Sequence, residues 1–156
     1  MKKFITITTQ TQLKPLNIKP LAIAKYFYRK GIFSHLVIQK LIYFAFLEGL
    51  KEDLLFFPEK FQAWKYGPVL SSVFEQMTNC SDLDEMFSQA PTLRQKQVIA
   101  ILEKVYRNHH KWNVWDLVDK SHEGPWAKTR GHLDSEAISI QEIELKDLVN
   151  FANAQK

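Results

Sequence analysis

The residues best suited to acid–base chemistry are His122 and Glu123, in the segment SHEGPW between Ser121 and Trp126. A histidine can act as a general base when a carboxylate orients its ring, and Ser121 or Cys80 would then supply the nucleophile of a hydrolase. Adjacent residues in a turn point in different directions, however, and the spacing differs from the HExxH pattern of zinc proteases. The hydrolase hypothesis would need these side chains clustered in one cleft. We interpret His122 as a hydrogen-bonded structural residue and predict no catalytic residues and no enzyme activity.

Metal or cofactor chemistry has little support in the residue pattern. His109 and His110 follow a basic segment and could meet His122 or His132 around a metal ion, but a solvated helix end is the favoured interpretation. Cys80 is the only cysteine, so neither a disulfide nor a cysteine-based zinc site is expected. The five glycines form neither a Walker A loop nor a dinucleotide-binding fingerprint. The sequence therefore predicts no metal and no cofactor.

Two polar residues, Gln39 and Lys40, interrupt an otherwise apolar segment, LVIQKLIYFA, from Leu36 to Ala45. A lysine with so many apolar neighbours must extend its amine to solvent, form a pair or face a cavity. Two interpretations are equally open. Lys40 is either a surface lysine whose stem packs against the core or part of a partner-binding site.

A second segment suited to binding is FQAWKYGPV, from Phe61 to Val69. Trp64 and Tyr66 alternate along an extended stretch with Lys65 between them, and a glycine–proline pair then turns the chain sharply. A packed hairpin corner is the favoured interpretation, because buried tryptophan usually belongs to the core. The alternative is an aromatic platform beside a lysine, of the kind that anchors protein interfaces.

The elements that must position these segments are mostly helices. The chain has 156 residues, of which 46% are hydrophobic and 24% charged, so it is long enough for one domain with its own core. Five glycines and six prolines are few for a loop-rich all-β protein. The sequence predicts a mainly α fold: a single compact helical bundle around a buried central helix at about 34–50, with at most a small two-stranded β element.

Apolar periodicity and capping residues set the predicted helix boundaries. Ser34 caps the central helix, which is apolar on nearly all sides. Thr92 and Gln95 form a capping-box pattern ahead of an amphipathic helix whose apolar residues lie between 98 and 106. Pro68 suits the first turn of a helix that ends near Met77. The other predicted helices are 20–30, 83–87 capped by Ser81, 114–120 capped by Asn113, 125–130 opened by Pro125, and a terminal helix from about 139.

Extended segments are predicted near the N-terminus and after the central helix. Residues 4–9 alternate apolar residues with threonine, which indicates a short strand or an extended arm. Residues 11–19 are interpreted as a connector. Residues 54–57 and 61–66 have an extended pattern, and the predicted two-stranded element lies there. The predicted division is an N-terminal arm or short strand over 1–19 and one helical domain over 20–156.

The charge pattern suits an acidic partner without requiring one. The formal net charge is +4, and the basic residues are scattered along the predicted helices and do not form one run. Nucleic-acid binding is therefore an open alternative that no local motif supports. The N-terminus lacks an apolar signal region, and the longest apolar run, 41–47, is far shorter than the roughly 20 residues of a membrane span. We expect a cytoplasmic protein with no membrane partner.

In this order, the three segments resemble the Panacea antitoxin domain, a family that includes SocA-like proteins and GepA-like phage-associated proteins. The family pattern has a helix similar to LxLQKLLYFA, a segment similar to FxAWxYGPV and a THExPW-like turn. The resemblance covers about residues 20–152. Ser121 stands where many members have threonine, and Gly124 interrupts the turn. The matching residues are Gln39, Lys40, Leu41, Tyr43, Phe44, Phe61, Ala63, Trp64, Tyr66, Gly67, Pro68, Val69, His122, Glu123, Pro125 and Trp126.

The resemblance implies an antitoxin that binds a cognate toxin directly, without catalysis. SocA-like members also deliver their toxin to a protease, so a Clp-type protease is a second expected partner. The alternative is a phage-associated nucleic-acid-binding or regulatory protein, motivated by the positive charge. The expected partner-binding residues are Lys40, Tyr43, Trp64, Lys65, Tyr66, His122, Glu123 and Trp126. The expected structural residues are Gln39, Gly67, Pro68 and Pro125.

Overall fold

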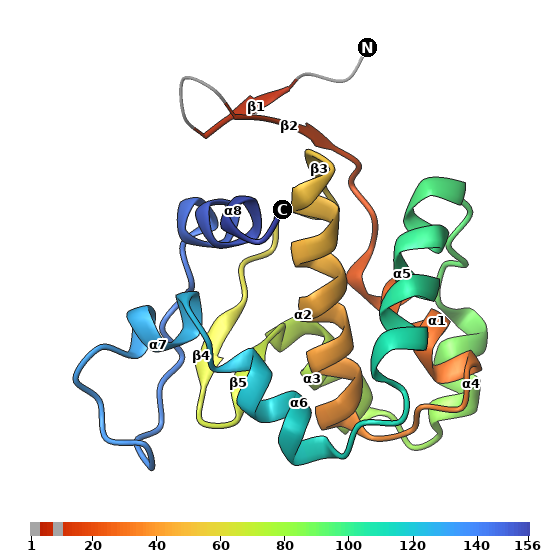
Figure 1. Cartoon of the computed structure of the whole chain (residues 1–156). Helices are drawn as coiled ribbons and strands as arrows, with labels where there is room; N and C mark the ends of the chain where they lie inside the picture. Colours follow the sequence, from red (N-terminus) through yellow and green to blue (C-terminus); the bar gives the residue numbers. More distant parts are fainter. Residues whose placement is uncertain (1–3, 8–10) are drawn as a thin grey trace.

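The predicted central helix is α2, His35–Lys51, in the computed structural model of the protein, which describes residues 4–7 and 11–156. Ser34 caps it as predicted, because its Oγ accepts a hydrogen bond from the N–H of Val37 at 3.3 Å. Twelve of its 17 residues are buried, so other elements must cover it on most sides. Figure 1 shows α2 running through the middle of the molecule.

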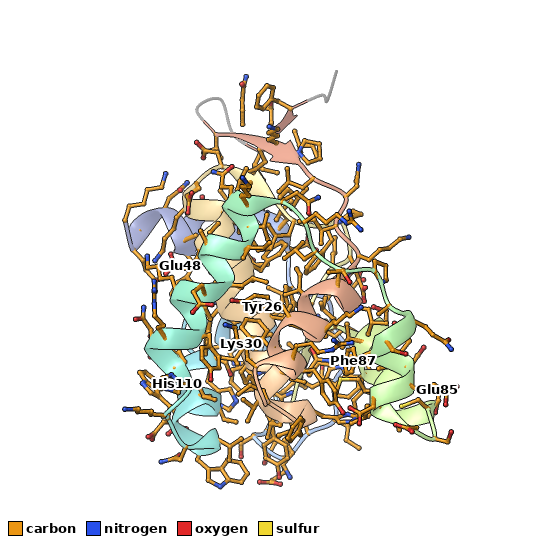
Figure 2. All side chains as sticks on the ribbon, turned by 90° about the vertical axis from the view of Figure 1, so that its right-hand side faces the viewer. Tyr26, Lys30, Glu48, Glu85, Phe87 and His110 are labelled. Carbon is orange, nitrogen blue, oxygen red and sulfur yellow. The ribbon has the colours of Figure 1, made fainter. Side chains whose placement is uncertain are left out.

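Amphipathic helices cover this central helix. Those that contact α2 are α1 (Pro20–Arg29), α5 (Lys96–His109), α6 (Val114–Ser121) and α8 (Leu145–Ala154). The shorter helices are α3 (Ser71–Asn79), α4 (Leu83–Gln89) and α7 (Pro125–Arg130). The fully buried Phe87 of α4 lies between α4 and α1 (Figure 2). Its ring stacks on that of Tyr28 of α1, with the centroids 4.6 Å apart. Apolar burial around α2 therefore holds the bundle together.

Two small sheets lie at the edge of the bundle. The first contains β1 (Ile5–Thr6), β2 (Gln12–Pro15) and β3 (Leu54–Leu55), with β1 antiparallel and β3 parallel to the middle strand β2. The second is a hairpin of β4 (Gln62–Trp64) and β5 (Gly67–Val69), in which Trp64 lies opposite Gly67. Figure 1 places the first sheet beyond the C-terminal end of α2 and the hairpin beside the helix.

The prediction of at most one two-stranded β element is therefore wrong, and the described fold is mainly α with two small sheets. The overlooked strand is β2, which lies in the 11–19 stretch that we interpreted as a connector. Its Leu13 is fully buried, and the N–H of Lys14 donates to Asp53 O at 2.8 Å. One buried leucine in four residues gives no alternation to detect, and the pairing with β3 joins segments far apart in the sequence.

The division into an arm over 1–19 and a helical domain over 20–156 stays a prediction. β1 lies within the predicted extended segment 4–9, of which residues 8 and 9 are outside the described part of the chain.

Local capping signals located several helices well. Asn113 caps α6 as predicted, since its Oδ1 accepts from the N–H of Asp116 at 2.9 Å. Pro125 opens α7 at the predicted residue. The cap of α4 is Asp82, one residue after the predicted Ser81.

Three predicted helix boundaries are wrong. In each case a residue that we assigned to the start of a helix makes a contact with a distant segment instead. Pro68 lies in β5, and α3 begins only at Ser71. The capping box at Thr92 does not form, because its Oγ1 accepts a hydrogen bond from Lys25 Nζ at 3.0 Å. The terminal helix begins at Leu145, since residues 141–143 bond to the backbone of β4 and the residue before it.

Candidate partner-binding site

The first and second motif segments are joined by Gln39, a residue of α2. Its Nε2 donates to Leu70 O at 3.1 Å, and its Oε1 accepts from the N–H of Leu70 at 2.9 Å. Leu70 follows β5 and is the N-cap of α3. Its carbonyl also accepts from the N–H of Phe74 in α3, whereas its own N–H finds its partner only in Gln39. The buried amide of Gln39 bonds to both groups and thereby fixes the chain between β5 and α3.

Lys40, the next residue of α2, has no exposed surface. Its Nζ donates one hydrogen bond, to Pro68 O at 3.1 Å, and no carboxylate in the described part of the chain forms an ion pair with it. Burial lowers the pKa of Lys40 from 10.5 to about 7. Lys40 is therefore not a surface lysine with a packed stem, which was one of our two interpretations. A direct contact with a partner would require the backbone of β5 to move aside.

Gly67 lets α2, β5 and α6 approach one another closely. Its φ of +115° lies in the region that favours glycine, and a Cβ there would be 2.4 Å from Ser121 Oγ and 2.8 Å from Lys40 Cε. No side chain fits in that space. We call the cluster of Gln39, Lys40, Gly67 and Ser121 the inner junction.

Tyr43 is also inside the protein, one turn along α2 from the inner junction. Its ring is 1% exposed and meets Phe61 edge-on, with the centroids 5.2 Å apart. The hydroxyl has no hydrogen-bond partner among the described residues, and burial raises its pKa. Tyr43 therefore packs in the core and presents no surface to a partner in this conformation.

The four residues of the hydrolase hypothesis lie in different environments. Ser121 is fully buried, and its Oγ donates to Val118 O at 2.7 Å. The ring of His122 is stacked on Trp126, with centroids 3.7 Å apart and planes 4° apart. Glu123 is exposed, and Cys80 lies at the end of α3. No common cleft joins them.

His122 is held by stacking, contrary to our interpretation of it as a hydrogen-bonded residue. Its Nε2 is buried without a hydrogen-bond partner in the described chain, and burial lowers its pKa. The Nε1 of the stacked Trp126 donates to Trp64 O at 2.7 Å, which joins the third motif segment to the second. Pro125, at the first position of α7, is buried.

Arg130, the last residue of α7, attaches the following loop, residues 131–142, to the hairpin. Its Nη1 donates to Ala63 O at 3.1 Å, and its Nη2 donates to Asp134 O at 3.0 Å and to Ala137 O at 2.9 Å. All three acceptors are backbone carbonyls. Beyond this anchor the loop carries Ile138, whose exposed fraction is 94%.

The outer surface of the hairpin carries the other three motif residues that we expected to bind a partner. Lys65 forms an ion pair with Glu136 of the loop, which raises the pKa of Lys65, and its Nζ lies 5.1 Å from the ring centroid of Tyr66. Tyr66 is 44% exposed and meets the 56% exposed Trp115 of α6 at a centroid distance of 5.7 Å. This surface is rich in exposed aromatic area.

Trp64 and Lys65 both line two apolar cavities on this surface. The larger, of about 260 Å³, is the Trp64 groove, and the smaller, of about 230 Å³, is the Ile140 hollow. Trp64 itself is half-buried and meets Phe74 of α3 edge-on at 4.8 Å. The groove is lined by His35, Leu36, Gln39, Trp64, Lys65, Tyr66, Val69 and Phe74. The hollow is lined by Trp64, Lys65, Ile138, Ser139 and Ile140.

The structure therefore divides the eight expected partner-binding residues. Trp64, Lys65 and Tyr66 share one open surface, whereas Lys40 and Tyr43 are buried. Leu36 of α2 and Phe74 of α3 line the groove but were not among the residues that we expected to bind a partner. Ile140, which lines the hollow, was assigned to a helix. The apolar periodicity of those segments identified core faces but gave no signal for the half-exposed residues at their ends.

A third depression, of about 690 Å³, lies between α5 and α6 and includes Glu123 and Trp112. At its edge Lys120 Nζ is 2.6 Å from His109 Nε2, and His109 Nδ1 is 2.9 Å from Val105 O. This geometry fits a neutral ring that donates from Nδ1 and accepts at Nε2, and burial lowers the pKa of His109. His109 is thus a buried residue, which corrects our interpretation of it as part of a solvated helix end.

Two general properties of the described chain bear on function. No three His, Cys, Asp or Glu side chains among the described residues are placed to hold one metal ion. In the same part of the chain, neither α2 nor any shorter helix combines the length and apolarity that a membrane span requires.

Comparison with known proteins gave one match. A family model described as "Antitoxin SocA-like, Panacea domain" matches residues 38–127, more than half of the chain, from within α2 to within α7. The matched range includes the inner junction and the hairpin, whereas Leu36 and the loop 131–142 lie outside it. No curated protein and no solved structure matched the chain.

Proposed function

This chain belongs to the family of SocA-like antitoxins with a Panacea domain, and we propose that it neutralises a cognate toxin by binding it directly, without catalysis. The observation that carries this proposal is the open aromatic surface of the hairpin. Exposed Tyr66 lines one of two apolar cavities that share Trp64, and its ring meets that of exposed Trp115. Clustered aromatic side chains at apolar cavities are where protein interfaces gain most of their binding energy.

Binding without catalysis is also supported by the third motif segment. A serine hydrolase needs a nucleophile that substrate can reach and a base within hydrogen-bond distance of it. Ser121 has no exposed surface and bonds to a backbone carbonyl, while the ring of His122 is stacked on Trp126. These residues are arranged as packing elements.

Nucleic-acid binding, the alternative that the positive charge suggested, has less support. Strong electrostatic binding to phosphates requires lysines and arginines that are free to face them. Six lysines of the described chain instead form ion pairs with carboxylates of the same chain: Lys30, Lys51, Lys60, Lys65, Lys104 and Lys128.

Co-expression with the product of the adjacent gene tests the proposal. We expect the neighbouring protein alone to stop growth, and co-expression of this chain to restore growth and to yield a complex of the two purified proteins. Failure of both rescue and complex formation would overturn the proposal. The half-life of the toxin in the same cells tests the additional adaptor role, since delivery to a Clp-type protease would shorten it in the presence of this chain.

A further inference from the structure

We propose that the Trp64 groove and the Ile140 hollow bind one face of an amphipathic helix of the toxin, with a carboxylate of that helix on Lys65 in place of Glu136. This inference rests on the proposed function and names the surface and the chemistry of the bound segment. Three observations support it: the cavities have an apolar lining, Lys65 carries a charge where they meet, and backbone groups of the hairpin are already hydrogen-bonded.

The two cavities call for apolar side chains from the partner. Leu36, Tyr66 and Phe74 line the groove, and Ile138 and Ile140 line the hollow. Ile138 and Ile140 are exposed to solvent at 94% and 69%. Water against this much apolar surface is unfavourable, and apolar side chains of a partner would release it. Because the two cavities share only Trp64 and Lys65 and otherwise have different linings, an occupant of both must present at least two apolar side chains.

The charge at the cavities selects an acidic partner segment. Lys65 lines both cavities, and among the described lining residues it is the only one with a fixed charge. No carboxylate lines either cavity. Its present counter-ion, Glu136, belongs to the loop 131–142, and the side chain of Glu136 is 72% exposed. An exposed ion pair of this kind contributes little to stability, so a carboxylate of the partner can replace Glu136 at small cost.

The backbone groups of Ala63, Trp64 and Leu70, beside the groove, are already hydrogen-bonded, which disfavours strand addition at the hairpin. On β4, the carbonyls of Ala63 and Trp64 accept from Arg130 and Trp126, and the N–H of Ala63 donates to Gln141 O. At the end of β5, Gln39 holds both backbone groups of Leu70. An extended peptide would find these backbone groups already paired. A helix satisfies its own backbone and can bury side chains in the groove.

Charge reversal at Lys65 tests the proposal with the purified product of the adjacent gene as the probe. We expect Lys65→Glu to raise the Kd roughly tenfold in about 0.1 M salt, with a smaller effect in about 1 M salt, because the interaction is electrostatic. Lys60→Glu is the matched control, since Lys60 is a similarly exposed lysine paired with Glu144 and lies outside both cavities. Equal effects of the two variants would overturn the role of Lys65.

Photo-cross-linking tests the helical occupant. A benzoylphenylalanine in place of Leu36, which lines the groove, is expected to link to a toxin segment that is helical and carries Asp or Glu within one turn of its apolar residues. The same substitution at Leu133, which is exposed but lines neither cavity, is expected to give no link. A complex that yields no link from Leu36, or a link to an extended strand or a basic segment, would overturn the proposal.

The outcomes separate this inference from the proposed function. If the wild-type chain neither rescues growth nor forms a complex, the proposed function fails and this inference fails with it. If the wild-type chain rescues growth and Lys65→Glu and Leu36→Glu rescue it equally well, the proposed function stands and this inference alone is wrong. Melting temperatures of the variants, expected within a few degrees of wild type for Lys65→Glu, exclude unfolding as the cause of lost rescue.

Discussion

Lys40 and Lys65 occupy two of the motif segments through which the chain resembles its family, yet their surroundings are opposite. Lys40 lies in the inner junction with no exposed surface and one hydrogen bond, whereas Lys65 lies at the edge of the Trp64 groove in an ion pair with Glu136. Burial lowers the pKa of the first, and the carboxylate raises the pKa of the second. Lying in a motif segment therefore does not by itself reveal whether a residue is buried or exposed. The buried Lys40 stands at a position that the family pattern specifies, and the partly exposed Lys65 stands at one that the pattern leaves open.

The contrast between the inner junction and the Trp64 groove has a simple physical basis. The inner junction consists of close approaches between backbone and side chains, in which any added atom must displace another. The groove consists of half-exposed side chains, and replacing one leaves solvent to fill the space. Changes at the inner junction should therefore alter the free energy of unfolding, and changes at the groove should alter toxin affinity.

The largest effect is expected from Gly67→Ala. A Cβ at this residue would clash with Ser121 Oγ and Lys40 Cε. The alanine would also have to keep a φ of +115°, which residues with a Cβ rarely adopt. Strain and overpacking together should lower the free energy of unfolding by about 4 kcal/mol, measured by urea denaturation. Gly31→Ala is the matched control: its φ is +93° but nothing lies within 4 Å of its Cβ, so about 1 kcal/mol is expected. Equal losses would mean that the inner junction is not crowded.

The next effect concerns pH. The pKa of Lys40 is about 7 in the folded state and 10.5 when unfolded, so between these values the unfolded chain binds more protons and stability rises with pH. We expect this term to contribute a rise in the free energy of unfolding of about 2 kcal/mol between pH 7 and pH 9. Lys40→Met should remove that rise, whereas Lys65→Met should leave it unchanged.

Parallel urea titrations of the wild type and the two methionine variants measure these slopes. The same pH dependence in the wild type and Lys40→Met would show that the Lys40 amine keeps its proton inside the protein, and would remove the contrast between the two lysines.

A smaller effect is expected from Tyr66→Ala, and it should appear in binding and not in stability. Tyr66 is partly exposed and its ring contacts Lys65 and Trp115, so its loss should weaken toxin binding about tenfold and lower the free energy of unfolding by less than about 1 kcal/mol. Trp112→Ala is the control, because Trp112 is similarly exposed but lies at the depression between α5 and α6. Isothermal titration calorimetry distinguishes the two surfaces. A larger loss from Trp112→Ala would move the interface there.

The smallest effect is expected from Ile138→Ser, which replaces an almost fully exposed apolar side chain. The free energy of unfolding should change by less than about 0.5 kcal/mol. Ile143→Ser, at a fully buried position five residues later, should cost about 3 kcal/mol, measured by the same denaturation. A large cost at Ile138 would show that the loop packs against the domain in solution.

Local signals predicted the elements that local contacts define. The caps Ser34 and Asn113 and the opening proline of α7 each act within one helical turn, and the structure has helices where these residues predicted them. The nearly continuous apolar character of α2 likewise indicated its central position. Such features need no knowledge of the rest of the chain.

Features that depend on distant contacts were missed. Thr92 accepts a hydrogen bond from Lys25, and Leu13 is buried where β2 pairs with β3. The sequence around these residues gives no signal of either contact. The proposed partner surface also depends on contacts between segments that are distant in the sequence. It combines the first turn of α2, the hairpin, α3 and the loop 131–142, so the motif gave Trp64 and Lys65 but not Leu36 or Phe74.

The way in which Arg130 holds the loop 131–142 bears on how new specificities can arise. The hydrogen bonds of Arg130 all go to main-chain carbonyls, those of Ala63, Asp134 and Ala137, and every residue type supplies that group. The loop can therefore exchange its exterior side chains, Glu136 and Ile138 among them, while its attachment to the hairpin is retained. An anchor that is indifferent to sequence makes this loop a natural place to diversify by mutation or to graft when the antitoxin is retargeted.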